Sequence, residues 1–203
     1  PTTLSNLEIV FLNDNRIEEM PDLTFLFKLK KLDLSGNNIK VLNKALPKEL
    51  KELSLQSNKL EAISKGILRA LVNLVSLDLS KNKLKEITEL PNSKSLDTLN
   101  LSFNQIFKIE GLDDTPNLSV LTISTNKLIE IPSAILTMNK LTTLDLSNND
   151  INTLPSELGL LKNLVRIVLD GNPLRANRNL LNIKGAQKLK ETLSAKLMPT
   201  EEE

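Results

Sequence analysis

The 203-residue sequence contains no cysteine, no histidine, no tryptophan and no tyrosine. The absence of cysteine and histidine excludes thiolates, disulfides and imidazole bases, together with most zinc sites. A chain without cysteine also fits a reducing compartment, so we expect the protein to be intracellular, in the cytoplasm. Because 40% of the residues are hydrophobic but only 2% are aromatic, the core must be aliphatic.

A charge excess of either sign is also missing. The 26 Lys and Arg residues and the 25 Asp and Glu residues leave a formal charge of +1. This balance produces no long-range field that would attract a phosphate backbone or an anionic membrane. The most apolar stretch, residues 158–169, contains charged side chains and is too short to cross a bilayer. We therefore expect neither nucleic acid nor membrane as a partner.

An eleven-residue template occurs eight times along the chain. It has aliphatic residues at positions 1, 4, 6 and 11 and asparagine at position 9, as in Leu96, Leu99, Leu101, Asn104 and Ile106. The position-9 asparagines, spaced 21 to 24 residues apart, are Asn15, Asn37, Asn58, Asn82, Asn104, Asn126, Asn149 and Asn172. This regularity predicts an array of equivalent structural units.

The Leu-x-Leu centre of each copy has a period of two, which indicates a short strand with one core face and one wet face. Only about ten residues connect one copy to the next, so the strands must stack in parallel, with turns or 3₁₀ pieces as the outer wall. From Leu7 to Leu174 the pattern resembles the leucine-rich repeat family. The resemblance implies an α/β fold: a curved, horseshoe-shaped solenoid with a parallel concave sheet, an irregular or 3₁₀ convex side and a C-terminal helical cap.

The outer segments resemble two subclasses of that family. Residues 131–135 and 154–159 are similar to Ras-group repeats, whereas residues 87–90 and 109–112 are similar to repeats of the protein phosphatase 1 regulatory subunit. Residues 170–185 also resemble the end of Ras-group proteins. These likenesses imply an intracellular signalling scaffold or a regulatory subunit.

The position-9 asparagine has a physical role where the chain turns away from the strand. Backbone N–H and C=O groups face the interior there, and an amide side chain satisfies both kinds. We expect the eight asparagines to form a structural ladder.

The chain divides into three predicted parts. Residues 1–174 hold eight repeats, residues 175–198 form a helical cap with a joint at Gly185, and residues 199–203 form an acidic, disordered tail. Few residues precede Leu7, so we expect an upstream segment or another subunit to cover the N-terminal end of the core.

Side chains between the core positions form columns on the wet face of the sheet. The predicted partner-binding residues in two of these columns are Ile9, Phe11, Lys31, Asp33, Glu52, Asp78, Asn100, Thr122, Asp145 and Arg166. The most informative are Ile9, Phe11, Lys31 and Glu52, because aromatic and long charged side chains serve as interface anchors. Ile9 and Phe11 have an alternative role as contacts to an upstream element, and Phe103 is interpreted as an ordinary aromatic packing along its turn.

No catalytic constellation emerges from the sequence. Asp33, Asp78 and Asp145 are expected roughly 10 Å or more apart, too far for a metal cage or an acid–base pair. We predict no metal, no cofactor and no enzymatic activity. The predicted function is protein–protein interaction through the concave sheet, and the alternative is a structural subunit of a large multiprotein assembly.

Overall fold

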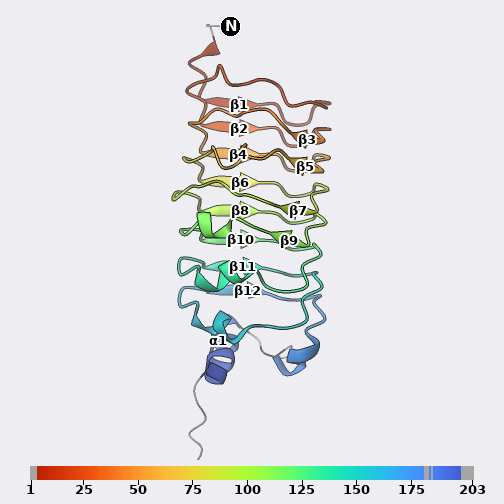
Figure 1. Ribbon diagram of the computed structural model, residues 1–203, viewed down its shortest axis with the longest axis vertical. Coiled ribbons are helices and arrows are strands. Elements are labelled where there is room, and N and C mark those ends of the chain that lie inside the picture. The colour runs from red at the N-terminus through yellow and green to blue at the C-terminus, as the bar shows by residue number, and fades with distance from the viewer. Residues whose placement is uncertain (1–3, 181–182, 184, 198–203) are drawn as a thin grey trace, which may run out of the picture.

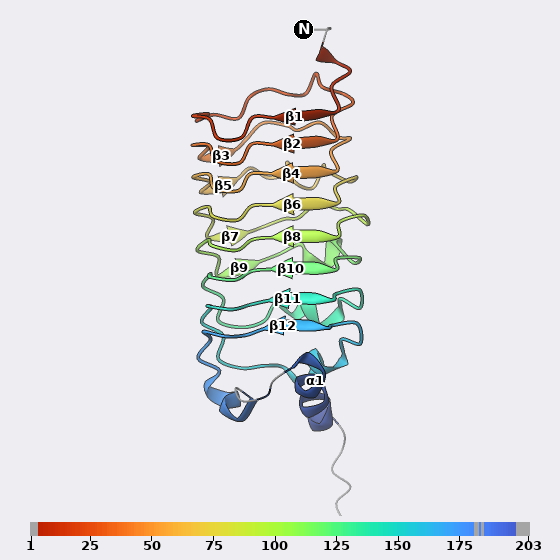
Figure 2. The ribbon, with the colours of Figure 1, turned by 180° about the vertical axis from the view of Figure 1, so that it is seen from behind.

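The computed structural model describes residues 4–180, 183 and 185–197. Within these residues, one parallel sheet contains eight three-residue strands in chain order, stacked like rungs along the long axis of the molecule (Figure 1; Figure 2 from behind). The strands are β1 (Ile9–Phe11), β2 (Lys31–Asp33), β4 (Glu52–Ser54), β6 (Ser76–Asp78), β8 (Thr98–Asn100), β10 (Val120–Thr122), β11 (Thr143–Asp145) and β12 (Arg166–Val168). The predicted parallel-sheet solenoid is confirmed.

The aliphatic template positions form the core. In the second to seventh repeats, all four positions are at most 2% exposed. Equivalent leucines pair across the sheet, as Leu77 with Leu99 and Leu99 with Leu121, so each layer packs on an identical neighbour. In the first repeat Val10, Leu12 and Ile17 are only half-buried, and in the last repeat Ile167 and Leu169 are half-buried.

The outer wall consists mainly of turns and 3₁₀ helices. The helices are η2 (Leu112–Asp114), η3 (Ser133–Thr137) and η4 (Ser156–Leu160), the last two beginning directly after Pro132 and Pro155. Two further two-stranded parallel sheets, which the sequence pattern did not predict, lie where the chain leaves the template. They pair β3 (Val41–Leu42) with β5 (Ala62–Ile63) and β7 (Glu86–Ile87) with β9 (Lys108–Ile109).

The residue before each ladder asparagine adopts a left-handed backbone conformation. Its φ lies between 53° and 75° at Asp14, Gly36, Ser57, Lys81, Phe103, Thr125, Asn148 and Gly171. Six of these eight residues are not glycine, although side chains disfavour this conformation. The repeat geometry therefore imposes the turn regardless of local preference.

The C-terminal end is covered by η5 (Arg175–Leu180), α1 (Ala186–Ser194) and η6 (Ala195–Leu197). Gly185 lies at the start of α1 with φ of 92°. Helix α1 packs on η4, where a Cβ added to Gly159 would lie 2.6 Å from the Lys190 carbonyl oxygen and 2.7 Å from the Ser194 nitrogen. Lys190 is buried, and its ammonium donates to the carbonyl oxygens of Leu161 and Lys162 at 3.3 and 3.2 Å.

The proposed boundaries at residues 174 and 198 stay predictions. The acidic tail predicted for residues 199–203 lies outside the described residues, as do residues 181, 182, 184 and 198 of the predicted cap.

Candidate protein-binding surface

The asparagine ladder holds successive repeats in register. Asn104 illustrates the pattern: its Nδ2 donates to the carbonyl oxygens of Leu79 and Leu101, both at 3.0 Å, and its Oδ1 accepts the Leu84 N–H at 3.0 Å. Each amide thus satisfies main-chain groups of its own repeat and of the preceding repeat. Acceptance of an N–H from the preceding repeat recurs at Asn37, Asn58, Asn82, Asn126, Asn149 and Asn172.

The two ends of the ladder depart from the prediction. Asn15 is exposed, and among the described residues its amide donates only within its own repeat, to the carbonyl oxygens of Leu12 and Asn13. Asn177, which the template did not include, is buried, and its Oδ1 accepts the Leu154 N–H at 2.8 Å. The buried ladder therefore runs from Asn37 to Asn177.

The predicted partner-binding side chains lie in two columns on the open face of the sheet, opposite the leucine core. Register pairing aligns one column as Ile9, Lys31, Glu52, Ser76, Thr98, Val120, Thr143 and Arg166. It aligns the other as Phe11, Asp33, Ser54, Asp78, Asn100, Thr122, Asp145 and Val168. Neighbouring members of a column are therefore about 4.8 Å apart, the spacing of paired strands.

Much of the second column is used by the fold itself. The Oδ1 atoms of Asp33, Asp78 and Asp145 accept the N–H of the residue two positions later, at 2.8 to 2.9 Å. Asn100 Nδ2 donates to Asp78 Oδ2 at 3.2 Å, and Thr122 Oγ1 donates to Asn100 Oδ1 at 2.8 Å. These side chains are half-buried and already hydrogen-bonded, which reduces their capacity for new contacts.

The strongest candidate anchors gather where β1, β2 and β4 lie side by side. Ile9 and Phe11 are 53% and 61% exposed, large values for apolar side chains. The Lys31 ammonium lies 6.0 Å from the centre of the Phe11 ring and 2.6 Å from a Glu52 carboxylate oxygen. The hydrogen bond to Glu52 and the attraction of its charge raise the pKa of Lys31. We call Ile9, Phe11, Lys31 and Glu52 the anchor cluster.

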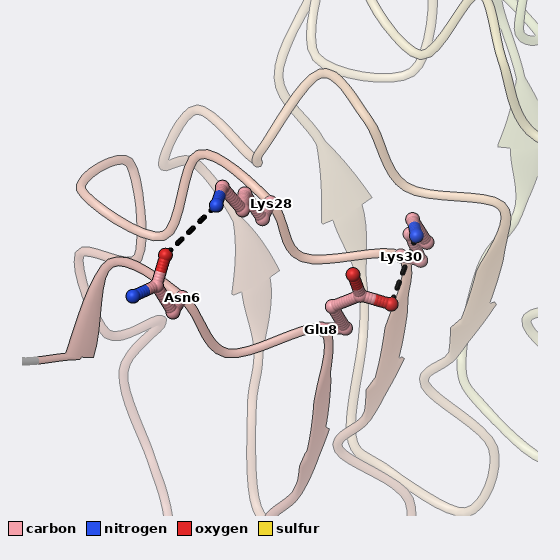
Figure 3. A network of polar contacts seen from close by, with 4 residues as sticks. All are labelled: Asn6, Glu8, Lys28 and Lys30. Atoms are coloured by element: carbon pink, nitrogen blue, oxygen red, sulfur yellow. Dashed lines mark hydrogen bonds and ion pairs between the residues drawn. The ribbon is translucent and has the colours of Figure 1, made fainter.

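A polar network borders the anchor cluster on the side where the chain enters the strands (Figure 3). Lys30 Nζ contacts Glu8 Oε2 at 2.8 Å, and Lys28 Nζ donates to Asn6 Oδ1 at 2.8 Å. The hydrogen bond from Lys30 and its positive charge lower the pKa of the Glu8 carboxyl. Charged side chains therefore border the anchor cluster before the start of β1 and β2, and Lys31 lies beside the Phe11 ring.

The opposite end of the open face is less distinctive. Arg166 is exposed, while Val120 and Val168 are half-buried. Among the described residues, no carboxylate oxygen forms an ion pair with Arg166 within 4.0 Å. Arg166 is thus far in the sheet from the anchor cluster, separated from it by the strands β6 to β11.

The interpretation of Phe103 as an ordinary aromatic that packs along its turn stays a prediction. Its side chain is 52% exposed, and its backbone is left-handed, with φ of 57°. Phe103 lies beyond the end of β8 and outside the two columns of the open face.

The described residues contain no group of three or more His, Cys, Asp or Glu side chains arranged to hold a metal ion. Among the helices of the described residues, none has the length and apolar character needed to cross a membrane. What the described surface offers is an array of exposed side chains at fixed spacing.

Comparison with known proteins agrees with this architecture. A family model described as "Leucine rich repeat" matches residues 48–106 and 116–174, more than half of the chain, and a second model described as "Leucine Rich repeat" matches residues 26–41. Members of this family typically serve as protein-interaction modules and are generally not catalytic. The chain spans less than a third of the length of the curated relatives that it matches.

Three relatives illustrate the range of the similarity. The chain is 34% identical over 96 residues to the "Protein phosphatase 1 regulatory inhibitor subunit PPP1R7 homolog" of Arabidopsis thaliana, covering 46% of this chain and 29% of that protein. Internalin C2 of Listeria monocytogenes superimposes with a TM-score of 0.70 at 26% identity, covering 84% of this chain and 74% of that chain. The plant peptide hormone receptor RGFR1, in complex with RGF2, gives a TM-score of 0.67 at 28% identity over 85% of this chain and 30% of that chain. The likeness of the C-terminal segment to Ras-group proteins, among them leucine-rich repeat-containing protein 40, stays a prediction.

Proposed function

The chain belongs to the leucine-rich repeat family, and from this premise we propose that it is a non-enzymatic recognition module that binds a protein partner through the open face of its sheet. The anchor cluster carries the proposal. Its four side chains project from three hydrogen-bonded strands, so their spacing is fixed before a partner arrives. A preorganised surface loses little conformational entropy on binding.

The chemistry of the anchor cluster favours a partner that combines an apolar side chain with polar groups. Phe11 supplies the exposed apolar area, while Lys31 and Glu52 supply one charge of each sign. The partner's apolar group would cover the ring, and the ion pair would either remain at the rim or exchange partners. Aromatic side chains are enriched at the centres of protein interfaces, where a partner covers them.

We further propose a regulatory or scaffolding role inside the cell. Similarity to a phosphatase regulatory subunit homolog supports regulation, and the peptide complex of the structurally similar plant receptor supports binding of a polypeptide. The absence of cysteine supports a reducing, cytoplasmic compartment.

Affinity purification with the complete chain, followed by mass spectrometry, tests the proposal when wild type is compared with a Phe11→Ser variant. We expect a partner that wild type retains and Phe11→Ser loses, with affinity lowered at least tenfold in a direct binding measurement. The matched control is Thr98→Ala on β8, away from the cluster, which should change the affinity less than twofold.

The same comparison distinguishes recognition from a purely structural role. A structural subunit would purify in a stoichiometric assembly held by other surfaces, and Phe11→Ser would leave that assembly intact. Retention of every partner by Phe11→Ser would contradict the proposed use of the open face.

A further inference from the structure

A second exposed apolar surface lies outside the open face, where the chain leaves the strands β6, β8 and β10. After β8 the chain alternates between exposed and buried side chains: Phe103 and Phe107 are 52% and 54% exposed, whereas Asn104 and Ile106 are buried. The two phenylalanines thus project outward from one short segment whose other side is fixed in the core.

The neighbouring repeats extend this surface on both sides. The Phe107 N–H donates to the Lys85 carbonyl oxygen at 2.9 Å, and the Lys127 N–H donates to the Ile106 carbonyl oxygen at 2.8 Å. The three segments are therefore adjacent. Ile129, which occupies the template position of Phe107 in the next repeat, is 63% exposed. We call Lys83, Lys85, Phe103, Phe107, Lys127 and Ile129 the turn-side surface.

The six residues of the turn-side surface include three lysines and no carboxylate. The carboxylates nearest in sequence, Glu86 and Glu130, follow Lys85 and Ile129, and Glu130 lines another hollow beside Phe107 together with Glu110 and Lys108. Among the described residues, Lys85 and Lys127 have no carboxylate within 4.0 Å, and Lys83 lies 3.9 Å from Glu61. A shallow hollow beside the phenylalanines is lined by Lys83, Lys85, the Gln105 amide and Glu61. Two ammonium groups and an amide outnumber the single carboxylate, so the hollow is suited to receive another carboxylate.

The apolar side chains and the lysines of the turn-side surface together favour one kind of ligand. Burying exposed aromatic and aliphatic side chains against apolar groups of a ligand is favourable, because it removes apolar surface from water. Lysines that have no carboxylate nearby attract acidic groups and increase the rate of association. A purely apolar ligand would leave the ammonium groups without a partner, and a basic ligand would be repelled.

We propose that the turn-side surface binds an acidic segment of another protein. An apolar side chain of the segment rests on Phe103, Phe107 and Ile129, and a carboxylate of the segment enters the hollow between Lys83 and Lys85. This surface does not overlap the anchor cluster, which comprises residues of β1, β2 and β4. It can therefore be tested separately from the proposed function.

The test uses the complete chain and a displayed library of random twelve-residue peptides. We expect the enriched peptides to carry net negative charge and at least one large apolar residue. A synthetic copy of an enriched peptide should bind at least tenfold more weakly to Phe107→Ser and to the Lys83→Glu/Lys85→Glu double variant. Its affinity should also fall as the salt concentration rises.

Matched controls separate this result from a general effect of the substitutions. Val165→Ser removes another strongly exposed apolar side chain, and Lys188→Glu reverses another exposed charge; both should leave peptide affinity within twofold of wild type. Thermal unfolding of every variant checks that the fold is retained.

Three outcomes would overturn the proposal. The first is enrichment of neutral or basic peptides, or of none above the background of the double variant. The second is an enriched peptide that binds Phe107→Ser and the double variant as tightly as wild type. The third is sedimentation showing that wild type self-associates through this surface, because the occupant would then be a second copy of the chain.

Discussion

The first and fifth repeats follow the same template, yet only the fifth forms a complete structural unit. Leu101 is fully buried and Asn104 is bonded to two repeats, whereas the equivalent Leu12 is half-buried and Asn15 bonds only within its own repeat. The template therefore specifies the shape of a turn, while neighbouring turns provide the burial and the hydrogen-bond partners. This is the nearest-neighbour behaviour expected of a solenoid.

The largest expected effect comes from replacing the leucine at template position 6 by alanine in each of the two repeats. Leu101→Ala should lower the free energy of unfolding by about 2 to 5 kcal/mol, because it removes buried methyl groups and leaves a cavity. Leu12→Ala should cost less than half as much, since its side chain is partly exposed in the native state. Urea unfolding of both variants measures the difference, and equal losses would contradict the comparison.

Replacing the ladder asparagines Asn104 and Asn15 by alanine should give the next largest difference in the free energy of unfolding. Asn104→Ala leaves the buried Leu84 N–H without its acceptor, which should cost about 1 to 3 kcal/mol. The Leu79 and Leu101 carbonyl oxygens each lose one hydrogen bond and keep another, from Asn82 and Asn126. Asn15→Ala should cost less than about 1 kcal/mol, because water reaches the groups it leaves. The unfolding midpoints of the two variants are the measurement, and an unchanged midpoint for Asn104→Ala would refute the role of the ladder.

The C-terminal end differs from the N-terminal end because α1 packs against η4 there. Gly159→Ala should separate the two helices, since the new Cβ would meet main-chain atoms of Lys190 and Ser194. We expect a loss of about 1 to 3 kcal/mol. Hydrogen exchange should show faster exchange in α1 with little change in β1 to β8. Uniform loss of protection would mean that the cap is not a local unit.

A substitution at a left-handed turn residue should have a smaller effect, and it should stabilise the fold instead of destabilising it. Thr125 has φ of 55° with a branched side chain, whereas Gly36 and Gly171 occupy the same position in other repeats. Thr125→Gly should stabilise the chain by up to about 1 kcal/mol, because glycine tolerates this backbone although it gains more freedom in the unfolded chain. A lower thermal midpoint would show that contacts of the Thr125 side chain outweigh the backbone strain.

The smallest expected effect concerns the exposed pair of Glu8 and Lys30. The lowered pKa of Glu8 means that its contribution to stability is present above the unfolded pKa and is lost as pH falls through the folded pKa. An NMR titration should show the Glu8 carboxyl titrating at higher pH in Lys30→Gln than in wild type. The same titration midpoint in both proteins would exclude the ion pair as the cause.

Sequence periodicity predicted the solenoid, the register of its columns and most of the ladder, because one repeated pattern specifies all of them. It did not predict β3, β5, β7 and β9, since two-residue strands in the connecting segments carry no periodic pattern. Position-specific features were missed as well. Lys190 resembles a solvated helix residue in sequence, and its burial depends on how α1 meets the carbonyl groups after η4.

The candidate binding residues were only partly predictable. The columns of the open face follow from counting, but Asp78 and Asn100 appear as free polar groups in sequence and are hydrogen-bonded to their neighbours in the fold. Phe107 and Ile129 each directly follow a core residue at template position 11. Their residue types are those of core residues, and it is their exposure in the fold that identifies them as surface residues. Recognition surfaces depend on such tertiary details, which local sequence does not encode.

Methyl NMR of the chain labelled at isoleucine tests the central claim most directly, with the protein captured by wild type as the ligand. If the open face at β1, β2 and β4 is the recognition surface, the Ile9 methyl signal should shift or broaden on titration, while the signals of the fully buried Ile106 and Ile151 stay nearly unchanged. An unperturbed Ile9 signal at saturating partner would contradict the claim.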